Sequence, residues 1–431
     1  MKKTLLDVGD VVFALERVGC GGSMGFIRKI CERAGLRLLP ALVCVTAIAV
    51  LGIGMQKEAF PASAPQQRHN YFVYVGTYTG PDSKGIYGYR FDEKTGSLSP
   101  MGVAAEVVNP SFVITDPAHR HLYAVTEMSE RGPNAYKEDG FISSFSIDPG
   151  TGALKFLNKV SSGGGGPCHL VVDKTGKILF VANYGSGNVV SFAIQADGSI
   201  GAKTGLDQHS GASVDPRRQR GPHAHAVVLS PDNRFLFVPD LGLDRILIYR
   251  IDEAKRSFAP NNPSYVAVTP GLGPRHFVFG AHARFAYAIC EMGSSVVAFS
   301  YDQASGRLTP VQTLSTLPPD FTGQDNSAEI QVDRSGRFLY ASNRGDDSIT
   351  VFQIDPQTGT LNKIQNVSTQ GKIPRNFVID PTGRYLLAAN QNSNNIVVFT
   401  IDSASGKLTP TTQTVDVSSP VSLLFVPAQA P

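Results

Sequence analysis

Histidine and arginine side chains recur shortly after prolines in this chain. His169, His225 and the pair Arg275-His276 each lie one to three residues after a proline. An imidazole can take a proton from water, and a guanidinium can stabilise a negatively charged oxygen or grip a phosphate or carboxylate through paired hydrogen bonds. Side chains of these types suit proton transfer to or from a ligand, or the binding of an anion.

The full set of candidates lies at the two ends of apolar segments. Arg275, Glu291 and Arg344 are the strongest of them, because clustered ionisable groups often mark a functional site. Candidates at the starts of segments are His169, His223, His225, Arg275, His276, Glu329, Arg375 and Asn376. Candidates at the ends are Glu127, Asn183, Tyr184, Asp240, Glu291, Asn343, Arg344, Asn390 and Gln391.

Structural roles remain open for several candidates. Asp240 can form an ion pair with Arg245, and the asparagines can hydrogen-bond a loop backbone instead of a ligand. His223 and His225 lie on one face of a strand, because side chains alternate with a period of two. Such a pair could bind zinc, but no third ligand is evident, so we predict no metal and no cofactor.

A repeat positions these side chains. Each copy has a proline-containing entry, an apolar run, a polar turn such as 333–336 or 380–383, and a second apolar run, which is typical of a β-hairpin. The starts of the copies are 46 to 57 residues apart. The copies span residues 109–127, 166–183, 221–240, 273–291, 327–344 and 373–390.

A second pair of strands follows each hairpin. Residues 348–361 are typical: apolar and polar residues alternate, and a glycine turn leads into another strand. The relatives of this segment are 85–98, 140–154, 188–200, 245–258, 295–308 and 395–408, so the second half occurs once more often than the first.

The missing first half is divided between the ends of the chain. Residues 71–77 resemble its second strand and residues 419–425 its first. Pairing of these strands would close a ring and remove its exposed sheet edges, whereas an open solenoid would not explain two half-repeats. We predict an all-β fold, a seven-bladed β-propeller of four-stranded antiparallel blades, closed by the N- and C-terminal strands.

The predicted ring brings the candidates together. The innermost strand of each blade starts on one face, and the second strand returns to that face. The starts of the first strands and the ends of the second strands therefore converge at one end of the central axis, which we call the mouth. A funnel of Arg, His, Glu, Asn and Asp side chains at the mouth is the expected site.

Composition excludes several classes of protein. The chain has 431 residues, of which 42% are hydrophobic and 17% charged, so disorder is not expected. No heptad pattern indicates a coiled coil, and only one long apolar run is present. Residues 65–431 carry 31 basic and 31 acidic side chains, so no field that would attract nucleic acid is expected.

The first 64 residues have the pattern of an export signal. Residues 38–56 carry no charge, Arg28, Lys29, Arg33 and Arg37 precede them, and Ala62-Ser-Ala64 resembles a cleavage site. We expect residues 1–64 to be a signal peptide or a membrane anchor, with Met24 as a possible true start, and residues 65–431 to be one propeller domain. The protein would then be exported, periplasmic or membrane-anchored. The alternative is an N-terminal extension on a cytoplasmic protein.

Cysteines do not define a site. Only Cys168 and Cys290 follow the leader, which is too few for a disulfide framework and lacks the CxxC spacing of a metal site. We interpret both as small buried residues.

Several motifs in register resemble the propeller-type 6-phosphogluconolactonase (lactonase) family. They include Gly166-Pro-Cys-His169, Pro222-His-Ala-His225, Gly273-Pro-Arg-His-Phe277 and Ser342-Asn-Arg-Gly345. The resemblance spans roughly residues 71–427. It implies a seven-bladed propeller, in agreement with the repeat. The family also includes fungal muconate-lactonizing enzymes, and similarity to these implies that the catalytic residues are His225 (or His223), Arg275, Glu291 and Arg344.

The resemblance implies metal-independent hydrolysis of a sugar lactone such as 6-phosphogluconolactone. Glu291 or a histidine would activate water, and Arg275 or Arg344 would face the oxyanion. The expected substrate-binding residues are His169, His223, His276, Glu329, Arg375 and Asp240. The expected partner is a small sugar lactone, bound by a monomer. Alternatives are a substrate without a phosphate or of muconate type, or an exported propeller that only binds a ligand or partner.

Overall fold

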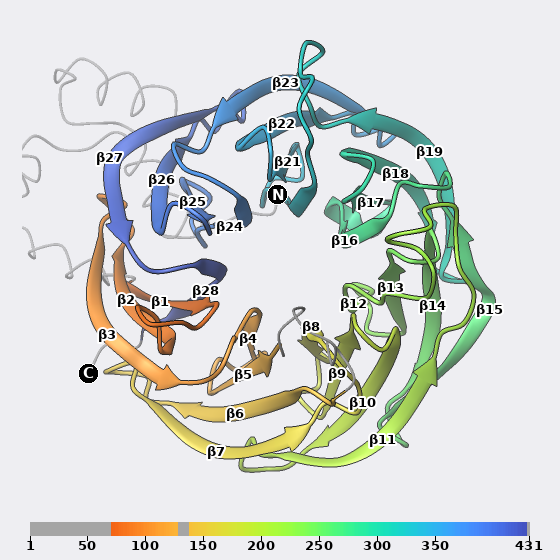
Figure 1. Ribbon diagram of the computed structural model, residues 1–431, viewed down its shortest axis with the longest axis horizontal. Helices are drawn as coiled ribbons and strands as arrows, with labels where there is room; N and C mark the ends of the chain where they lie inside the picture. Colours follow the sequence, from red (N-terminus) through yellow and green to blue (C-terminus); the bar gives the residue numbers. More distant parts are fainter. Residues whose placement is uncertain (1–69, 128–137, 429–431) are drawn as a thin grey trace, which may run out of the picture. The chain divides into compact units, whose positions relative to one another are not determined.

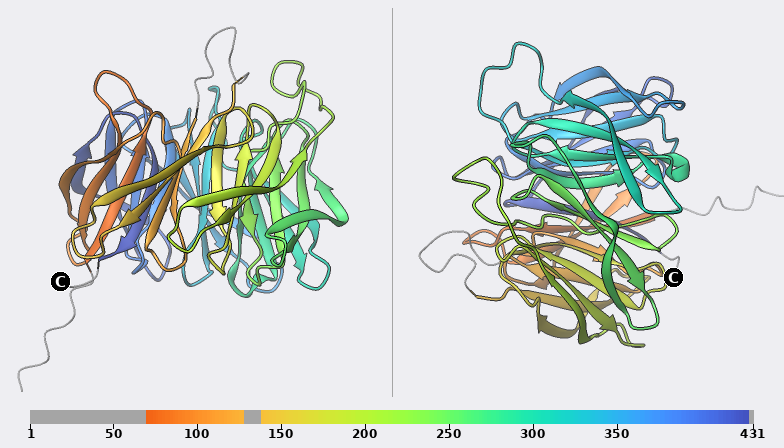
Figure 2. Two further views of the ribbon diagram at one scale, coloured as in Figure 1. Left: turned by 90° about the horizontal axis from the view of Figure 1, so that it is seen from below. Right: turned by 90° about the vertical axis from the view of Figure 1, so that its right-hand side faces the viewer.

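Seven four-stranded antiparallel sheets make up the described part of the chain, residues 70–127 and 138–428, in this computed structural model. The sheets are arranged as blades around a common axis (Figure 1). The predicted seven-bladed all-β propeller is therefore confirmed. Figure 2 shows the ring edge-on, with loops on both faces.

The innermost strands of the blades surround the axis. They are β28 (Pro420–Pro427), β4 (Val113–Thr115), β8 (Pro167–Val172), β12 (Val228–Leu229), β16 (Pro274–Phe279), β20 (Ser327–Val332) and β24 (Pro374–Ile379). The second strands are β1 (Asn70–Thr77), β5 (His121–Thr126), β9 (Ile178–Asn183), β13 (Phe235–Asp240), β17 (Phe285–Cys290), β21 (Phe338–Asn343) and β25 (Tyr385–Asn390).

The two outer strands of each blade complete the sheets. The third strands are β2 (Gly85–Asp92), β6 (Phe141–Ile147), β10 (Asn188–Ile194), β14 (Arg245–Asp252), β18 (Ser295–Asp302), β22 (Ser348–Ile354) and β26 (Asn395–Ile401). The fourth strands are β3 (Leu98–Glu106), β7 (Leu154–Ser161), β11 (Ile200–Gln208), β15 (Ser257–Ala267), β19 (Arg307–Ser315), β23 (Leu361–Ser368) and β27 (Leu408–Asp416). One 3₁₀ helix, η1 (Ala281–Ala283), lies between β16 and β17.

Stacking of the blades explains the burial of their strands. Strands β9, β13, β21 and β25 are buried at every position, because a neighbouring blade covers each face of the sheet. The fourth strand β11 instead contains exposed positions along its length. The hydrophobic core is accordingly a series of clusters between adjacent blades, such as the one that joins Phe237 to Phe299.

Aspartate and glycine form the predicted turns between the first and second strands. Asp380 Oδ1 accepts the N–H groups of Arg384 and Tyr385 at 2.8 and 2.7 Å. Gly383 has a φ of +75°, a conformation that favours glycine. The turn lies at the end of the strands opposite the mouth. The starts of the innermost strands are therefore not part of the turn and can carry functional side chains.

The ring closes through the two ends of the described chain. Strand β1 pairs antiparallel with β28, from Tyr71 opposite Pro427 to Thr77 opposite Pro420. This blade has the order β28-β1-β2-β3. The predicted closure is confirmed, so opposite ends of the sequence contribute to one blade.

The predicted leader, residues 1–64, lies outside the described residues. Within 70–127 and 138–428, no helix is long and apolar enough to span a membrane.

Candidate functional site

A cavity of about 520 Å³ lies at the predicted mouth. Most of its lining comes from residues at or just before the starts of innermost strands and just after second strands, and Arg217 and Arg218 come from the connection between β11 and β12. Of the candidates predicted from the sequence, it contains Glu127, Tyr184, His223, His225, Glu291, Arg344 and Arg375. The convergence expected from the ring therefore occurs, and it brings side chains from several blades to one space.

Glu291 is the centre of the charged cluster. Its Oε2 atom lies 3.1 Å from Arg275 Nε and 2.7 Å from Arg344 Nη2, and its Oε1 atom lies 2.7 Å from Arg218 Nη2. Burial alone would raise the pKa of Glu291, but Arg344, Arg275 and Arg218 outweigh burial and hold that pKa well below its ordinary value. Glu291 therefore carries a negative charge and fixes three guanidinium groups. For the same reason, it is a weak proton acceptor.

Arg275 lies behind the cavity wall. It is only 2% exposed, its Nε bonds to Glu291 and its Nη1 donates to the Ala328 carbonyl at 2.7 Å. Arg344 lines the cavity, and it is held by bonds from Nε to Asn326 O at 3.0 Å and from Nη2 to Glu291. Of these two arginines, Arg344 is thus the one placed to meet a ligand in the cavity.

Two histidines line the cavity in different environments. His225 is 5% exposed, with Nε2 3.8 Å from Glu291 Oε2. Burial lowers the pKa of His225 well below its usual range, and the nearby Arg275 lowers it further, so this imidazole is neutral and a weak base. His223 is less buried, and its ring stacks on Tyr184 with a centroid separation of 4.4 Å.

Hydrogen bonds fix the tautomer of His223. Its Nδ1 atom lies 2.9 Å from the carbonyl oxygen of Tyr184, which can only accept a hydrogen bond. Nδ1 must then carry the hydrogen, and Nε2 is the atom with a lone pair when the ring is neutral. Asp240 Oδ1 holds the backbone N–H of His223 at 2.8 Å. This arrangement suits a general base better than that of His225 or Glu291.

A second layer of predicted residues lies outside the cavity lining. His276 Nδ1 is 3.2 Å from Glu329 Oε2, and Asn376 Nδ2 donates to the same oxygen at 2.6 Å. The ring of His169 lies 5.2 Å from that of His276. These residues come from β8, β16, β20 and β24, so the layer joins innermost strands of different blades.

The raised pKa of Glu329 predicts an unusual dependence of stability on pH. Burial raises the pKa of Glu329 from 4.5 to about 7, although Arg275 acts in the opposite direction. The folded state then binds a proton that the unfolded state has lost between these pH values, so the free energy of unfolding falls as the pH rises through this window. Relative to Glu329→Gln, the wild type should lose roughly 3 kcal/mol between about pH 4 and pH 8. Urea unfolding of both proteins at each pH tests this; a difference that does not vary with pH would contradict it.

Asp240 and the asparagines at the ends of second strands bond to other groups of the protein, which is the structural role predicted as an alternative to ligand binding. The predicted partner of Asp240 was wrong. Asp240 is fully buried and pairs with His209 at 2.6 Å, not with Arg245, whose guanidinium packs on the ring of Tyr265. The asparagines at the ends of second strands donate to carbonyl groups of the connections between blades. These bonds run from Asn183 to Ser162, from Asn343 to Thr316 and from Asn390 to Thr369.

Four lining residues were not predicted: Cys168, Arg217, Arg218 and Asn326. Arg217 and Arg218 lie in the connection between β11 and β12, outside the repeated segments. Their signal in the sequence is a cluster of arginines at 217, 218 and 220 in a chain with few charges. Cys168 and Cys290 are free and buried, as expected, and burial raises the pKa of both thiols, so Cys168 is not an activated nucleophile.

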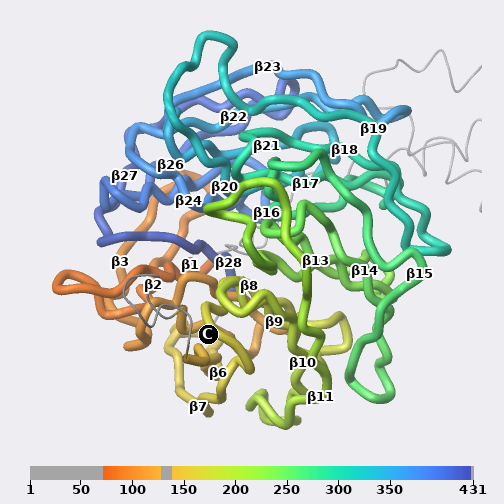
Figure 3. The backbone as a smooth tube through the Cα atoms, turned by 45° about the vertical axis from the view of Figure 1, so that its right-hand side comes forward, coloured from red at the N-terminus to blue at the C-terminus, as the bar shows by residue number. Residues whose placement is uncertain are grey.

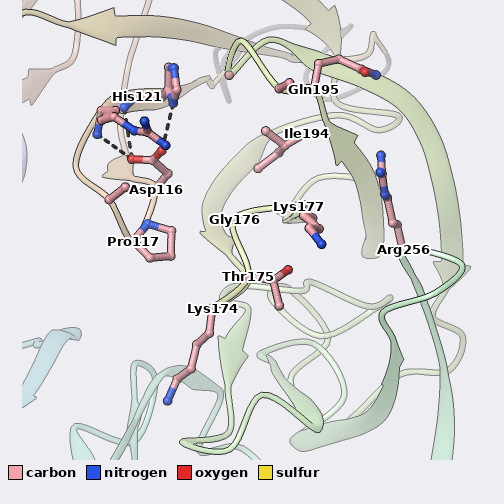
Figure 4. Close-up of a pocket in the computed structure, with 14 residues that line it drawn as sticks. Asp116, Pro117, His121, Lys174, Thr175, Gly176, Lys177, Ile194, Gln195 and Arg256 are labelled. Atoms are coloured by element: carbon pink, nitrogen blue, oxygen red, sulfur yellow. Dashed lines mark hydrogen bonds and ion pairs between the residues drawn. The ribbon is translucent and has the colours of Figure 1, made fainter.

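A second cavity, of about 490 Å³, lies at the opposite ends of the strands. Figure 4 shows Lys174, Lys177 and Arg256 at separate points around it. The only carboxylate in its lining, Asp116, accepts the N–H groups of Arg120 and His121 and pairs with the His121 ring at 2.9 Å. This aspartate therefore fixes a hairpin turn, and the cavity at the mouth is the stronger candidate for chemistry.

Within the described residues, no group of three or more His, Cys, Asp or Glu side chains is placed to hold a metal ion. Metal independence stays a prediction, which an assay with a chelator can test.

Comparisons with known proteins identify a family. The sequence model described as "Lactonase, 7-bladed beta-propeller" matches residues 72–425. The 6-phosphogluconolactonase of Bacillus subtilis is 34% identical over 356 residues, which cover 83% of this chain and 98% of the relative. The 6-phosphogluconolactonase of Formosa agariphila is 35% identical over 315 residues, which cover 71% of this chain and 86% of the relative.

A solved structure agrees with these sequence matches. The periplasmic gluconolactonase of Pseudomonas aeruginosa has a TM-score of 0.78 at 37% identity, and the match covers 84% of this chain and 100% of that chain. The fold, the match to the family model and the identity to these relatives lead to one conclusion. The chain belongs to the family of seven-bladed β-propeller lactonases.

Proposed function

We propose that the protein hydrolyses a sugar lactone of the 6-phosphogluconolactone type in the cavity at the mouth. The observation that carries this proposal is the cluster in which Glu291 holds Arg344, Arg275 and Arg218 beside His223. Relatives named 6-phosphogluconolactonase support a phosphorylated substrate, and the Pseudomonas aeruginosa relative, described as a gluconolactonase, is the reason that gluconolactone is assayed beside it.

His223 is the proposed general base. Water attacks the lactone carbonyl carbon while the Nε2 atom of neutral His223 takes a proton from that water. Collapse of the tetrahedral intermediate breaks the bond between the carbonyl carbon and the ring oxygen. The imidazolium returns its proton to that oxygen, so the product is an open-chain hydroxy acid. A well-placed general base of this kind contributes about 10²–10⁴-fold to the rate.

Arg344 is the proposed donor to the oxyanion. It lines the cavity, and Glu291 and the Asn326 carbonyl fix its guanidinium before substrate arrives. A fixed charge aimed at the carbonyl oxygen favours the transition state over the ground state, because negative charge on that oxygen develops during the reaction. Arg275 would act through Glu291 as a positioning residue.

Acid release from lactones tests this function. Purified protein is mixed with 6-phosphogluconolactone or with gluconolactone, and the initial rate of acid release is compared with spontaneous opening, with and without a chelator. We expect release above the spontaneous rate that the chelator leaves unchanged. Loss of activity with chelator would contradict the metal-free mechanism. Failure to accelerate either lactone would contradict the proposal and favour a propeller that binds a ligand without catalysis.

We also propose that residues 1–64 direct export. The charge-free run 38–56 supports this, as does the description of the Pseudomonas aeruginosa relative as periplasmic. N-terminal sequencing of protein from cell fractions should find a start after Ala64 outside the cytoplasm, or an intact chain in the membrane fraction. An intact chain confined to the cytoplasm would contradict export.

A further inference from the structure

We propose that Arg217 and Arg218, on the connection between β11 and β12, recognise a phosphate carried by the sugar part of the substrate. This inference rests on the proposed lactone hydrolysis. It names the side chains that would distinguish a phosphorylated lactone from a neutral one.

The connection that carries these arginines is longer than the other connections between blades. It spans residues 209–227, whereas the connection between β19 and β20 spans 316–326 and the others are shorter still. Figure 3 labels β11, which precedes this connection, and β13, the second strand of the blade that follows it. Asp215 Oδ1 accepts the N–H groups of Arg217 and Arg218 at 2.7 and 2.8 Å, which fixes the turn that presents the two side chains.

Gln219 anchors this turn to the rest of the site. Its side chain is fully buried and donates to Leu241 O at 2.9 Å and to Asp244 Oδ2 at 2.8 Å. The carboxylate of Asp244 also accepts the N–H groups of Gly271 and Gly273, each at 2.7 Å. Because Gly273 comes directly before β16, which carries Arg275, one buried aspartate sets the positions of Arg218 and Arg275 together.

Arg218 has donors to offer a ligand. Both hydrogen bonds of its side chain use Nη2, to Glu291 Oε1 at 2.7 Å and to Tyr184 OH at 3.2 Å. The side chain is 40% exposed and lines the cavity, and within the described residues Nε and Nη1 make no hydrogen bond. Arg217 is exposed, lines the same cavity and makes no side-chain hydrogen bond or ion pair with the described residues.

The balance of charge at the cavity favours a dianionic ligand. Its lining contains four guanidinium groups, from Arg217, Arg218, Arg344 and Arg375, and two carboxylates, from Glu127 and Glu291. Arg275 adds a further positive charge behind Glu291. A phosphate would offset this excess through charge-assisted, paired hydrogen bonds, for which guanidinium is well shaped. A neutral sugar lactone would carry no charge to offset this excess among the described lining residues.

The test compares two lactones with one set of variants. Arg217→Gln and the double variant with Arg218→Gln are assayed on 6-phosphogluconolactone and on gluconolactone, and Arg220→Gln is the control from the same connection. We expect the KM of the double variant for the phosphorylated lactone to rise about 10- to 100-fold. For Arg217→Gln, kcat/KM for gluconolactone should change less than about threefold, because the Arg217 side chain makes no hydrogen bond or ion pair with the described residues of the Glu291 cluster. The double variant also removes the ion pair between Arg218 and Glu291, so it should lose activity on both lactones, with the larger loss on the phosphorylated one. Arg217→Gln alone, an exposed substitution, should show part of the KM increase without a change in folding.

The outcomes separate this inference from the proposed function. An unchanged KM for the phosphorylated lactone, or equal losses on both lactones, would overturn the assignment of Arg217 and Arg218. A wild type that opens gluconolactone as efficiently as the phosphorylated lactone would also overturn it, while lactone hydrolysis would stand. A wild type that opens neither would contradict the proposed function, and this inference with it.

Discussion

Replacing Glu291 with alanine should cost both stability and activity. The substitution leaves Arg275 buried without its carboxylate partner, and removing one member of a buried ion pair typically costs about 3–5 kcal/mol of unfolding free energy. It also removes the carboxylate that pairs with Arg344 and Arg218, so these two charges are held less firmly in the cavity. We expect kcat/KM for lactone hydrolysis to fall at least about 10²–10³-fold, which is the scale for loss of one fixed oxyanion donor.

A milder variant keeps this prediction testable if the alanine variant does not fold. In Glu291→Gln, the side-chain amide keeps one oxygen that can accept a hydrogen bond from an arginine. It lacks the negative charge that holds the guanidinium groups of Arg275, Arg344 and Arg218. It should unfold at a lower urea concentration than the wild type and lose most of its activity. Glu106→Gln is the matched control, because Glu106 forms an exposed pair with Lys84, for which a change within about 0.5 kcal/mol is expected. Wild-type kcat/KM in Glu291→Gln would contradict the role given to the cluster.

Replacing His223 with glutamine should lower kcat about 10²–10⁴-fold and leave folding largely intact. The imidazole is partly exposed, so the substitution removes the proposed base without opening a large hole in the core. In His223→Ala, added imidazole should restore part of the rate, because it can occupy the vacated space and accept the proton. These effects are measured as initial rates of acid release with saturating lactone.

The control for this prediction is His282→Asn. His282 is exposed at the opposite ends of the strands and has a left-handed backbone, with a φ of +61°, that asparagine tolerates. Its kcat should match that of the wild type. A His223→Gln variant with an undiminished kcat would show that another group takes the proton.

The ring could be predicted because the same sequence pattern recurs in each blade. Apolar runs, aspartate–glycine turns and the half-repeats at 71–77 and 419–425 each point to the same arrangement, and the pairing of β1 with β28 confirms it. The repeat also predicted which positions reach the mouth, because each hairpin places its first-strand start and second-strand end on one face.

The roles of individual side chains depend on details that the repeat does not encode. The ladders of β8, β16 and β24 are irregular next to their prolines, so Cys168, Arg275 and Arg375 fall where the simple alternation of side chains fails. Alternation therefore could not show that Arg275 lies behind Glu291 while Arg375 lines the cavity. The same limit applies to His169, His276 and Glu329, which form a layer outside the cavity lining.

Arg217 and Arg218 escaped prediction for a different reason. They belong to a connection that has no counterpart of equal length in the other blades. Their placement depends on Gln219, the next residue along the chain, and on its hydrogen bond to Asp244, which lies 25 residues farther on. Contacts of this kind arise from tertiary structure, so composition could flag the arginines but could not place them.

The most direct test of the central claim, that lactones open at the mouth of the propeller, is one set of initial rates of acid release from 6-phosphogluconolactone. The set contains the wild type, His223→Gln at the mouth, and Lys177→Ala at the cavity on the opposite ends of the strands. The account predicts hydrolysis above the spontaneous rate for the wild type and Lys177→Ala, and a loss of about 100-fold or more for His223→Gln. Full activity of His223→Gln together with loss of activity in Lys177→Ala would contradict it.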